Sequence, residues 1–169
     1  MNKSYYLDTN AFFKYYCEEK GSEKIRELVS NDENICYISE LTFLEITNIL
    51  LTIYRTPKQD QLKNSKRLQA YSKRRVKLII TQMLGDIENC LFKLEKIPTD
   101  NLFENARTLL LNHAENLNFG SLDALHIAIV ESGWKNREIY FVTSDGSGGG
   151  RLIGVCKELN IPVYDPEKS

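Results

Sequence analysis

The sequence is poor in the residues that define fibrous, disordered or disulfide-stapled proteins. Only 4 prolines and 9 glycines occur in 169 residues, which excludes a collagen-like or low-complexity chain. The four cysteines lie far apart without a C-x-x-C pair, and neither histidine is close to one of them in the sequence. A thiolate zinc site is therefore not expected.

Long apolar runs are also missing. No uncharged apolar stretch approaches the roughly 18 residues that a membrane-spanning helix needs. The N-terminus MNKSYYLDTN lacks the apolar run and the cleavage site of a signal peptide. We therefore expect a cytoplasmic protein whose cysteines are free and mostly buried thiols.

The chain as a whole lacks an excess of positive or negative charge, but one segment of it does not. The 22 basic and 23 acidic residues leave a net charge of −1, which by itself does not indicate a polyanionic partner. Between residues 55 and 77, however, nine cations accompany one anion. This stretch therefore carries +8 and the rest of the chain −9. It opens a cationic helical region at about residues 55–90.

Short apolar segments alternate with longer helical ones, and this pattern predicts the fold class. The predicted strands are residues 4–7, 35–38, 91–97, 139–143 and 161–164. The predicted helices are residues 9–30, 40–55, 100–117, 122–132 and 152–159, with a polar helical region that ends near residue 89. We expect one domain over residues 1–169, an α/β/α sandwich around a five-stranded parallel sheet.

Four acidic residues follow strands in a way that brings them to one edge of such a sheet. Asp8 comes directly after the first strand, and Asp145 follows the fourth. Glu45 lies in the second turn of the helix over residues 40–55, and Asp123 lies in the first turn of the helix over residues 122–132. In open α/β sheets the carboxyl ends of the strands meet in one crevice. Carboxylates without thiolates or a histidine cluster favour Mg²⁺ or Mn²⁺ over Zn²⁺.

Each of these residues also has a purely structural interpretation. Asp8 can cap the first helix, and Asp145 before Gly146 is a common turn pair. Glu45 can belong to a solvated polar stripe, and Asp123 can stabilise a helix start. Asp123 lies on an almost wholly apolar helix, so we expect its carboxylate to be partly buried.

Four segments resemble motifs of the PIN-domain nucleases, in particular the VapC-type toxins of toxin–antitoxin pairs. The segments are YYLDTNAF, ISELTFLE, LNFGSLDALHIA and FVTSD, and they occur in the family's order over essentially the whole chain. The resemblance implies a parallel sheet of order 3-2-1-4-5. It also implies that Asp8, Glu45, Asp123 and Asp145 bind Mg²⁺ or Mn²⁺ for endoribonuclease action.

Under this hypothesis, metal-bound water attacks the RNA phosphodiester and no covalent nucleophile is needed. Thr9, Asn10, Ser39 and Thr143 can orient the ligand carboxylates. His126 is expected to be a packing or hydrogen-bonding residue rather than a catalytic one.

The cationic region can bind the RNA backbone, because phosphate contacts supply affinity that does not depend on sequence. The candidate contacts are Lys66, Arg67, Lys73, Arg74 and Arg75. A solvated helix face or a dimer contact explains the same charge.

The resemblance further implies a homodimer and a cognate antitoxin that covers the acidic crevice. One alternative stays open, namely a catalytically inactive PIN fold used as an RNA-binding or protein-interaction module. An aspartyl phosphatase is disfavoured, since Asp8 is followed by Asn10 where that chemistry needs a second aspartate.

Overall fold

Five short parallel strands form the centre of the molecule. The computed structural model describes residues 3–55, 72–97, 100–117, 120–133, 138–144 and 151–168. The strands are β1 (Lys3–Leu7), β2 (Asn34–Ser39), β3 (Lys93–Glu95), β4 (Ile139–Val142) and β5 (Val163–Tyr164). They pair in the order β3-β2-β1-β4-β5, and every pair is parallel. The predicted sheet and its order are confirmed.

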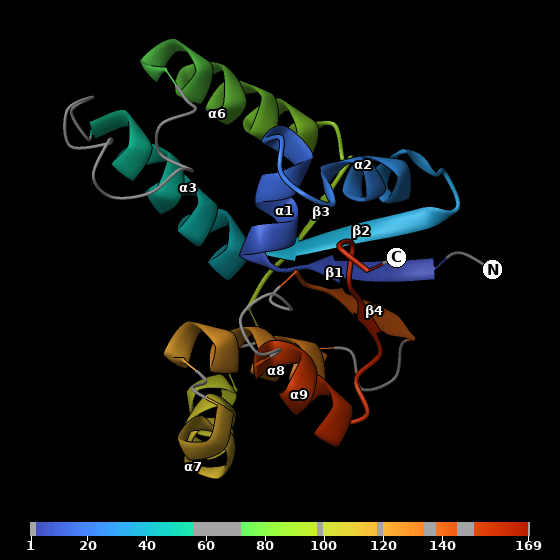
Figure 1. The fold of residues 1–169 in the computed structure, drawn as a ribbon, viewed down its shortest axis with the longest axis vertical. Helices are drawn as coiled ribbons and strands as arrows, with labels where there is room; N and C mark the ends of the chain where they lie inside the picture. Colours follow the sequence, from blue (N-terminus) through green and yellow to red (C-terminus); the bar gives the residue numbers. More distant parts are fainter. Residues whose placement is uncertain are drawn as a thin grey trace.

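Helices cover both faces of this sheet, because right-handed crossovers between parallel strands place them there. In chain order the helices are α1 (Thr9–Tyr16), α2 (Ser22–Ser30), α3 (Glu40–Arg55), α6 (Lys73–Glu88), α7 (Leu102–Leu117), α8 (Ser121–Gly133) and α9 (Arg151–Glu158). Figure 1 shows α1, α2, α3 and α6 on one side of the sheet and α7, α8 and α9 on the other. The predicted three-layer sandwich is thus confirmed.

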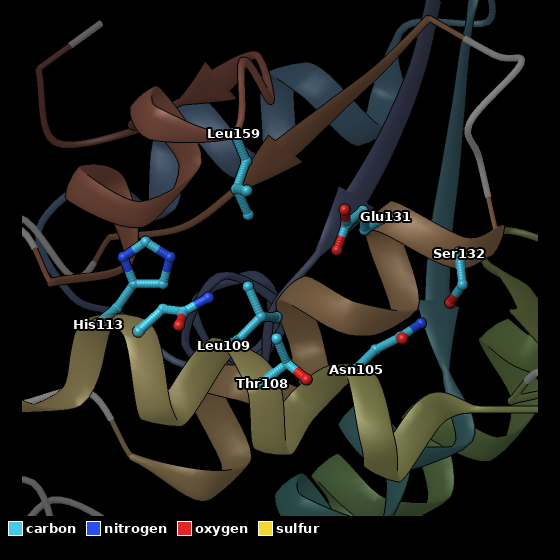
Figure 2. Close-up of a pocket in the computed structure, with 8 residues that line it drawn as sticks. Asn105, Thr108, Leu109, His113, Glu131, Ser132 and Leu159 are labelled. Carbon is cyan, nitrogen blue, oxygen red and sulfur yellow. The ribbon is translucent and has the colours of Figure 1, made fainter.

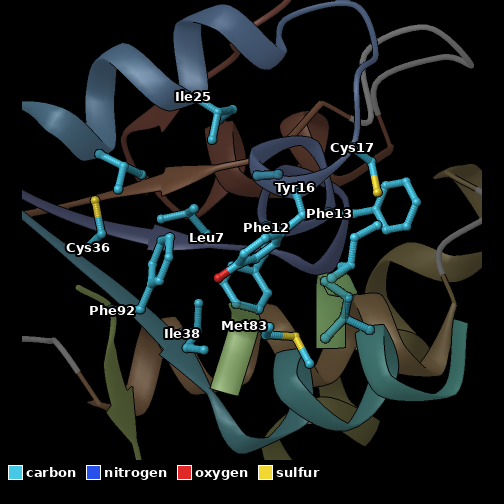
Figure 3. Packing of buried hydrophobic residues seen from close by; sticks show 14 of the residues in the cluster. Leu7, Phe12, Phe13, Tyr16, Cys17, Ile25, Cys36, Ile38, Met83 and Phe92 are labelled. Carbon is cyan, nitrogen blue, oxygen red and sulfur yellow. The ribbon is translucent and has the colours of Figure 1, made fainter. Parts of the chain in front are cut away.

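The side chains of β1 alternate between two hydrophobic cores, because successive residues of a strand point to opposite faces. Tyr5 and Leu7 belong to the core shared with α1, α2, α3 and α6, whereas Tyr6 belongs to the core shared with α7, α8 and α9. Figure 3 shows the first core, where the rings of Phe12 and Phe92 meet edge to face with centres 4.9 Å apart. The alternation directs Tyr6 toward α8, and the candidate site depends on this direction.

The single helix predicted over residues 9–30 is wrong, since the structure has two helices there. The first ends where Cys17 adopts an extended conformation, with φ −122° and ψ 132°. The second begins after Gly21, whose φ is +84°. A Cβ at Gly21 would lie 2.9 Å from the carbonyl oxygen of Pro166, so both the φ angle and the space favour glycine.

The other predicted elements agree with the structure to within two residues at each end. The helix predicted over residues 40–55 has the same bounds as α3. The third strand is shorter than predicted, at Lys93–Glu95. In the cationic region, residues 56–71 lie outside the described part of the chain. Its described helix, α6, begins after Ser72, whose Oγ accepts a hydrogen bond from the backbone N–H of Arg75 at 3.2 Å.

A buried lysine ties the C-terminal turn to α1. Lys14 is only 3% exposed, and its Nζ donates to the carbonyl oxygen of Lys20 at 2.6 Å and to Glu167 Oε1 at 2.8 Å. The hydrogen bond with Lys14 lowers the pKa of Glu167 below its usual value. The pair of Lys14 and Glu167 thus holds the C-terminal turn against α1.

The cysteines are free thiols, as predicted. Cys17, Cys36 and Cys156 are buried, and Cys90 is exposed. Burial raises the pKa of the Cys36 and Cys156 thiols to about 12, so both are unreactive at neutral pH. In the part of the chain that the structure describes, no helix has the length and apolar character to cross a membrane.

Candidate functional site

Asp8 stands at the carboxyl end of the central strand and caps the helix that follows. Its Oδ1 accepts a hydrogen bond from the backbone N–H of Ala11 at 2.6 Å, as the N-cap of α1. The residue is only 2% exposed. The capping role considered from the sequence is therefore real, and it holds a carboxylate in a fixed, buried position at this edge of the sheet.

Glu45 reaches the same corner from α3. Its Oε2 accepts a hydrogen bond from Thr9 Oγ1 and lies 2.7 Å from His126 Nε2. Burial alone would raise the pKa of Glu45, but the hydrogen bonds from His126 and Thr9 outweigh it and the pKa lies below its usual value. Glu45 is therefore an ionised, half-buried carboxylate next to the residue that follows Asp8.

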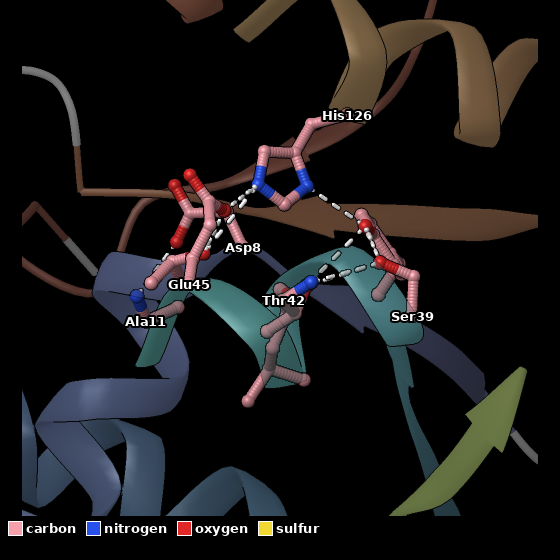
Figure 4. Close-up of polar contacts among 9 residues, drawn as sticks. Asp8, Ala11, Ser39, Thr42, Glu45 and His126 are labelled. Carbon is pink, nitrogen blue, oxygen red and sulfur yellow. Dashed lines mark hydrogen bonds and ion pairs between the residues drawn. The ribbon is translucent and has the colours of Figure 1, made fainter. Parts of the chain in front are cut away.

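His126 projects from α8 into a buried polar network beneath these carboxylates. Its Nδ1 lies 2.8 Å from the hydroxyl of Tyr6, which lies 2.8 Å from Ser39 Oγ and 3.4 Å from Thr42 Oγ1. Figure 4 shows the imidazole between the carboxylates on one side and these hydroxyls on the other. Burial raises the pKa of Tyr6 above its usual value, although hydrogen bonds to Ser39 and Thr42 act in the opposite direction.

Asp123 caps its own helix. Its Oδ2 accepts a hydrogen bond from the backbone N–H of Gly120 at 3.0 Å, three residues before it. The side chain is partly buried, as the sequence predicts. The structure thus gives Asp123 the helix-start role considered from the sequence. The fourth predicted carboxylate, Asp145, lies outside the described residues.

A hard divalent cation fits the chemistry of Asp8 and Glu45, which supply carboxylate oxygens at one corner. The described hydrogen bonds of Glu45 both fall on Oε2. Oε1 is then the oxygen that a cation would use. Among the described residues, however, no three acidic, histidine or cysteine side chains form a group that could hold a metal ion. Within the described ranges, the acidic side chains at this corner are therefore Asp8 and Glu45.

The predicted supporting residues differ in how they relate to the carboxylates. Thr9 bonds Glu45 directly, whereas Ser39 connects to it only through Tyr6 and His126. Thr143 is fully buried after β4. Asn10 lies in the first turn of α1 and is partly buried.

Of the predicted RNA contacts, the structure describes Lys73, Arg74 and Arg75 and places them exposed in the first turn of α6. Lys66 and Arg67 lie outside the described residues. The ammonium of Lys73 lies 5.1 Å from the ring centre of Tyr54 on α3, a cation–π distance.

This cationic turn lies at the far end of the α3–α6 pair from Glu45. Figure 1 shows α3 and α6 side by side, projecting away from the sheet. Glu45 and Tyr54 are separated by about 14 Å along α3, from the rise per helical residue. A bound polyanion would have to extend over that length to contact both.

A separate polar cavity of about 270 Å³ lies on the other side of the sheet. Asn105, Leu109 and His113 of α7 form one wall, and Glu131 of α8 lies opposite (Figure 2). The described residues that line it do not include Asp8, Glu45 or His126. The cavity is therefore distinct from the carboxylate corner.

The residues that sequence reasoning missed are Tyr6 and Thr42, together with the link between His126 and Glu45. The prediction that His126 is a hydrogen-bonding residue is confirmed. Two signals in the sequence were available. Tyr6 alternates with Tyr5 and Leu7 in the first strand, so its side chain is expected on the opposite face of the sheet, and His126 follows Asp123 by three residues, almost one helical turn.

Three solved structures share this fold over nearly the whole chain. VapBC2 from Rickettsia felis, bound to a DNA fragment from its promoter, has a TM-score of 0.59 at 15% identity and covers 96% of this chain and 98% of that one. FitAcB from Neisseria gonorrhoeae has a TM-score of 0.57 at 11% identity, with 96% and 97% covered. DNA-bound VapBC from Salmonella typhimurium has a TM-score of 0.55 at 14% identity, with 97% and 98% covered.

Comparison at the level of sequence identifies the family. No curated protein sequence matches the chain. A family model, that of the PIN domain, matches residues 5–145, a span that includes all four predicted carboxylates. Because this match covers most of its 169 residues, the chain belongs to the PIN domain family, a family of nucleases.

Proposed function

We propose that the protein is a divalent-metal-dependent endoribonuclease and the toxin of a VapC-type toxin–antitoxin pair. The observation that carries the proposal is the meeting of Asp8 and Glu45 at the carboxyl ends of the central strands, with one Glu45 oxygen fixed by Thr9 and His126. Such a corner concentrates negative charge that a hard cation offsets.

Asp8, Glu45, Asp123 and Asp145 would together hold Mg²⁺ or Mn²⁺. A bound cation of this kind lowers the pKa of a water molecule and offsets charge on the scissile phosphate. The protein's own part is positional. The Ala11 N–H holds Asp8, and Thr9 holds Glu45. Asn10, Ser39 and Thr143 would help orient the ligand carboxylates.

RNA would bind along the α3–α6 pair. The exposed cations Lys73, Arg74 and Arg75 lie at its far end, and Lys66 and Arg67 precede them in the sequence. Lysine and arginine contacts to phosphates give affinity without base specificity. An RNA strand that spans from this end to Glu45 would present one phosphodiester to the carboxylates.

The proposed partners are a cognate antitoxin and a second copy of the chain. The proposed location is the cytoplasm, where the RNA substrate is found. Support for an antitoxin comes from two neighbours in fold, which are VapBC assemblies bound to DNA. Light scattering tests the homodimer, since a dimer has twice the chain mass of 19.5 kDa. A monomer at all concentrations would refute that part.

Cleavage of an end-labelled RNA of mixed sequence tests the nuclease. The reactions contain Mn²⁺, Mg²⁺ or EDTA, and they compare the wild type with Asp123→Asn. A matched control is Glu131→Gln, which neutralises a carboxylate on the same helix beside the separate cavity. We expect metal-dependent cleavage by the wild type and the control but none by Asp123→Asn. Undiminished cleavage by Asp123→Asn would remove this residue from the metal site.

The second candidate function is an inactive PIN fold that binds RNA or protein. Two observations favour it. Asp123 caps its own helix, and no group of three ligands forms among the described residues. Calorimetric titration with Mn²⁺ separates the two. Binding supports the nuclease, whereas its absence, together with absent cleavage, supports the binding module.

A further inference from the structure

A continuous series of hydrogen bonds runs from the first turn of α3 through the core and back to Glu45 on the same helix. It passes from the Thr42 N–H to Ser39 Oγ, the Tyr6 hydroxyl, the His126 imidazole and Glu45 Oε2 (Figure 4). The successive distances are 3.2, 2.8, 2.8 and 2.7 Å. We infer that His126 is a positioning residue that fixes the carboxylate of Glu45, and that Tyr6 fixes His126. The inference rests on the proposed role of Glu45 as a metal ligand.

The carboxylate at the end of the series sets the direction of its last hydrogen bond. The Thr42 N–H only donates, and the Glu45 carboxylate only accepts. His126 Nε2 must therefore carry a proton and donate a hydrogen bond to Glu45. A Tyr6 hydroxyl that donates to His126 Nδ1 leaves Ser39 to donate to Tyr6, since two hydroxyl oxygens 2.8 Å apart need a proton between them. Every proton then points toward Glu45.

The destination of the series explains what it does at the site. His126 and Thr9 both bond Oε2 of Glu45, so the two donors hold the carboxylate by one oxygen. The other oxygen, Oε1, is the one presented for a cation. Removing a group that holds a metal-binding carboxylate in this way commonly lowers metal affinity or activity by about 10- to 100-fold.

Burial makes the series rigid. Tyr6, Ser39 and Thr42 are fully buried, and His126 is 4% exposed. Water therefore does not compete for these hydrogen bonds, and an unpaired member would be costly. If His126 only filled space on α8, an apolar residue would serve as well, whereas both of its ring nitrogens have partners here.

Two substitutions of His126 separate positioning from packing. The terminal amide of Gln lies near the place of Nε2 and can donate to Glu45, whereas that of Asn lies near the place of Nδ1 and reaches only toward Tyr6. Both remove the imidazole and both keep an amide in the core. The pair His126→Gln and His126→Asn is thus a matched test of the bond to Glu45.

The first readout is Mn²⁺ affinity by calorimetry, with the thermal midpoint as a measure of folding. We expect His126→Asn to weaken Mn²⁺ binding by about 10- to 100-fold. We expect His126→Gln to keep most of the Mn²⁺ affinity of the wild type. Their thermal midpoints should be similar. Tyr6→Phe should weaken Mn²⁺ binding less than His126→Asn, because Thr9 and His126 still bond Glu45.

The second readout is the ¹⁵N spectrum of the His126 ring in the metal-free protein. A proton on Nε2 is expected, because that nitrogen faces the carboxylate. A proton on Nδ1 alone would overturn the inference, and so would equal Mn²⁺ affinity in the Gln and Asn variants when the wild type binds Mn²⁺. If the wild type neither binds Mn²⁺ nor cleaves RNA, the proposed function itself fails and takes the positioning role with it.

Discussion

Replacing Tyr6 with phenylalanine removes one hydroxyl from a fully buried ring and takes a hydrogen-bond partner from each of two polar side chains. The hydroxyl lies 2.8 Å from both Ser39 Oγ and His126 Nδ1, and the residue is 0% exposed. Each buried partner left unsatisfied costs about 1–3 kcal/mol, so we expect the free energy of unfolding to fall by roughly 2–4 kcal/mol, since Ser39 can still turn to Thr42. In a chain of this length, that corresponds to a melting midpoint lower by roughly 5–15 °C.

Tyr16→Phe is the matched control, since it removes the same atom from another buried tyrosine. Among the described residues, no atom makes a hydrogen bond of normal geometry with the Tyr16 hydroxyl, although burial and the nearby Asp86 carboxylate raise the Tyr16 pKa, and the residue is 6% exposed. Removing the hydroxyl should cost less stability than Tyr6→Phe, because no hydrogen bond of normal geometry is lost. Urea denaturation at neutral pH measures both variants against the wild type. A cost for Tyr16→Phe that equals that of Tyr6→Phe would refute the reasoning.

Three further predictions concern other parts of the chain. Glu167→Gln should cost about 1–2 kcal/mol at neutral pH by breaking the pair with buried Lys14, less than for a fully buried pair because Glu167 is partly exposed. Because Lys14 lowers the pKa of Glu167, this stabilisation exists above the unfolded-state pKa of about 4.3 and is lost as the pH falls through the folded-state pKa, so denaturation curves of the two proteins should converge in acid. Gly21→Ala should cost about 1–3 kcal/mol in thermal unfolding, because φ is +84° and the new Cβ meets a backbone carbonyl oxygen. Joint Arg74→Glu and Arg75→Glu should weaken RNA binding and flatten its dependence on salt by about 1–2 in logarithmic slope.

The control for Glu167→Gln is a second glutamate that pairs with a lysine on the surface. Glu27→Gln breaks an exposed pair with Lys24 and should leave stability almost unchanged. A difference between the wild type and Glu167→Gln that persists at low pH would contradict the assigned ion pair. An unchanged stability of Gly21→Ala would contradict the prediction, since it would mean that the C-terminal turn moves away from the new Cβ at little cost. An unchanged salt slope would favour a solvated face on α6.

The fold was predictable because its signals are local. Apolar periodicity places α3 at Glu40–Arg55, whereas the strand order was implied by the resemblance to the PIN-domain nucleases. The break between α1 and α2 was not predictable, because the pattern continues through it. The conformation of Gly21 is matched to Pro166, a residue that meets it only in the folded chain.

The candidate site was predictable only in part. The rule that polar groups gather at the carboxyl ends of strands places Asp8 and Glu45 together. The hydrogen bonds of His126 join residues that are 120 positions apart, for Tyr6, and 81 apart, for Glu45. No local pattern specifies such pairs, because the packing of α8 against β1 and α3 creates them. Asp123 shows the reverse case, since its capping bond is local and was considered from the sequence.

Calorimetric titration with Mn²⁺ of the wild type, Glu45→Gln and Glu40→Gln tests the central claim most directly. Glu40 lies exposed in the first turn of the same helix, so its variant removes an equal charge without touching the carboxylate corner. We predict that Glu45→Gln loses most of its Mn²⁺ affinity and that Glu40→Gln binds like the wild type. Equal binding by all three proteins would contradict a metal site built on Asp8 and Glu45.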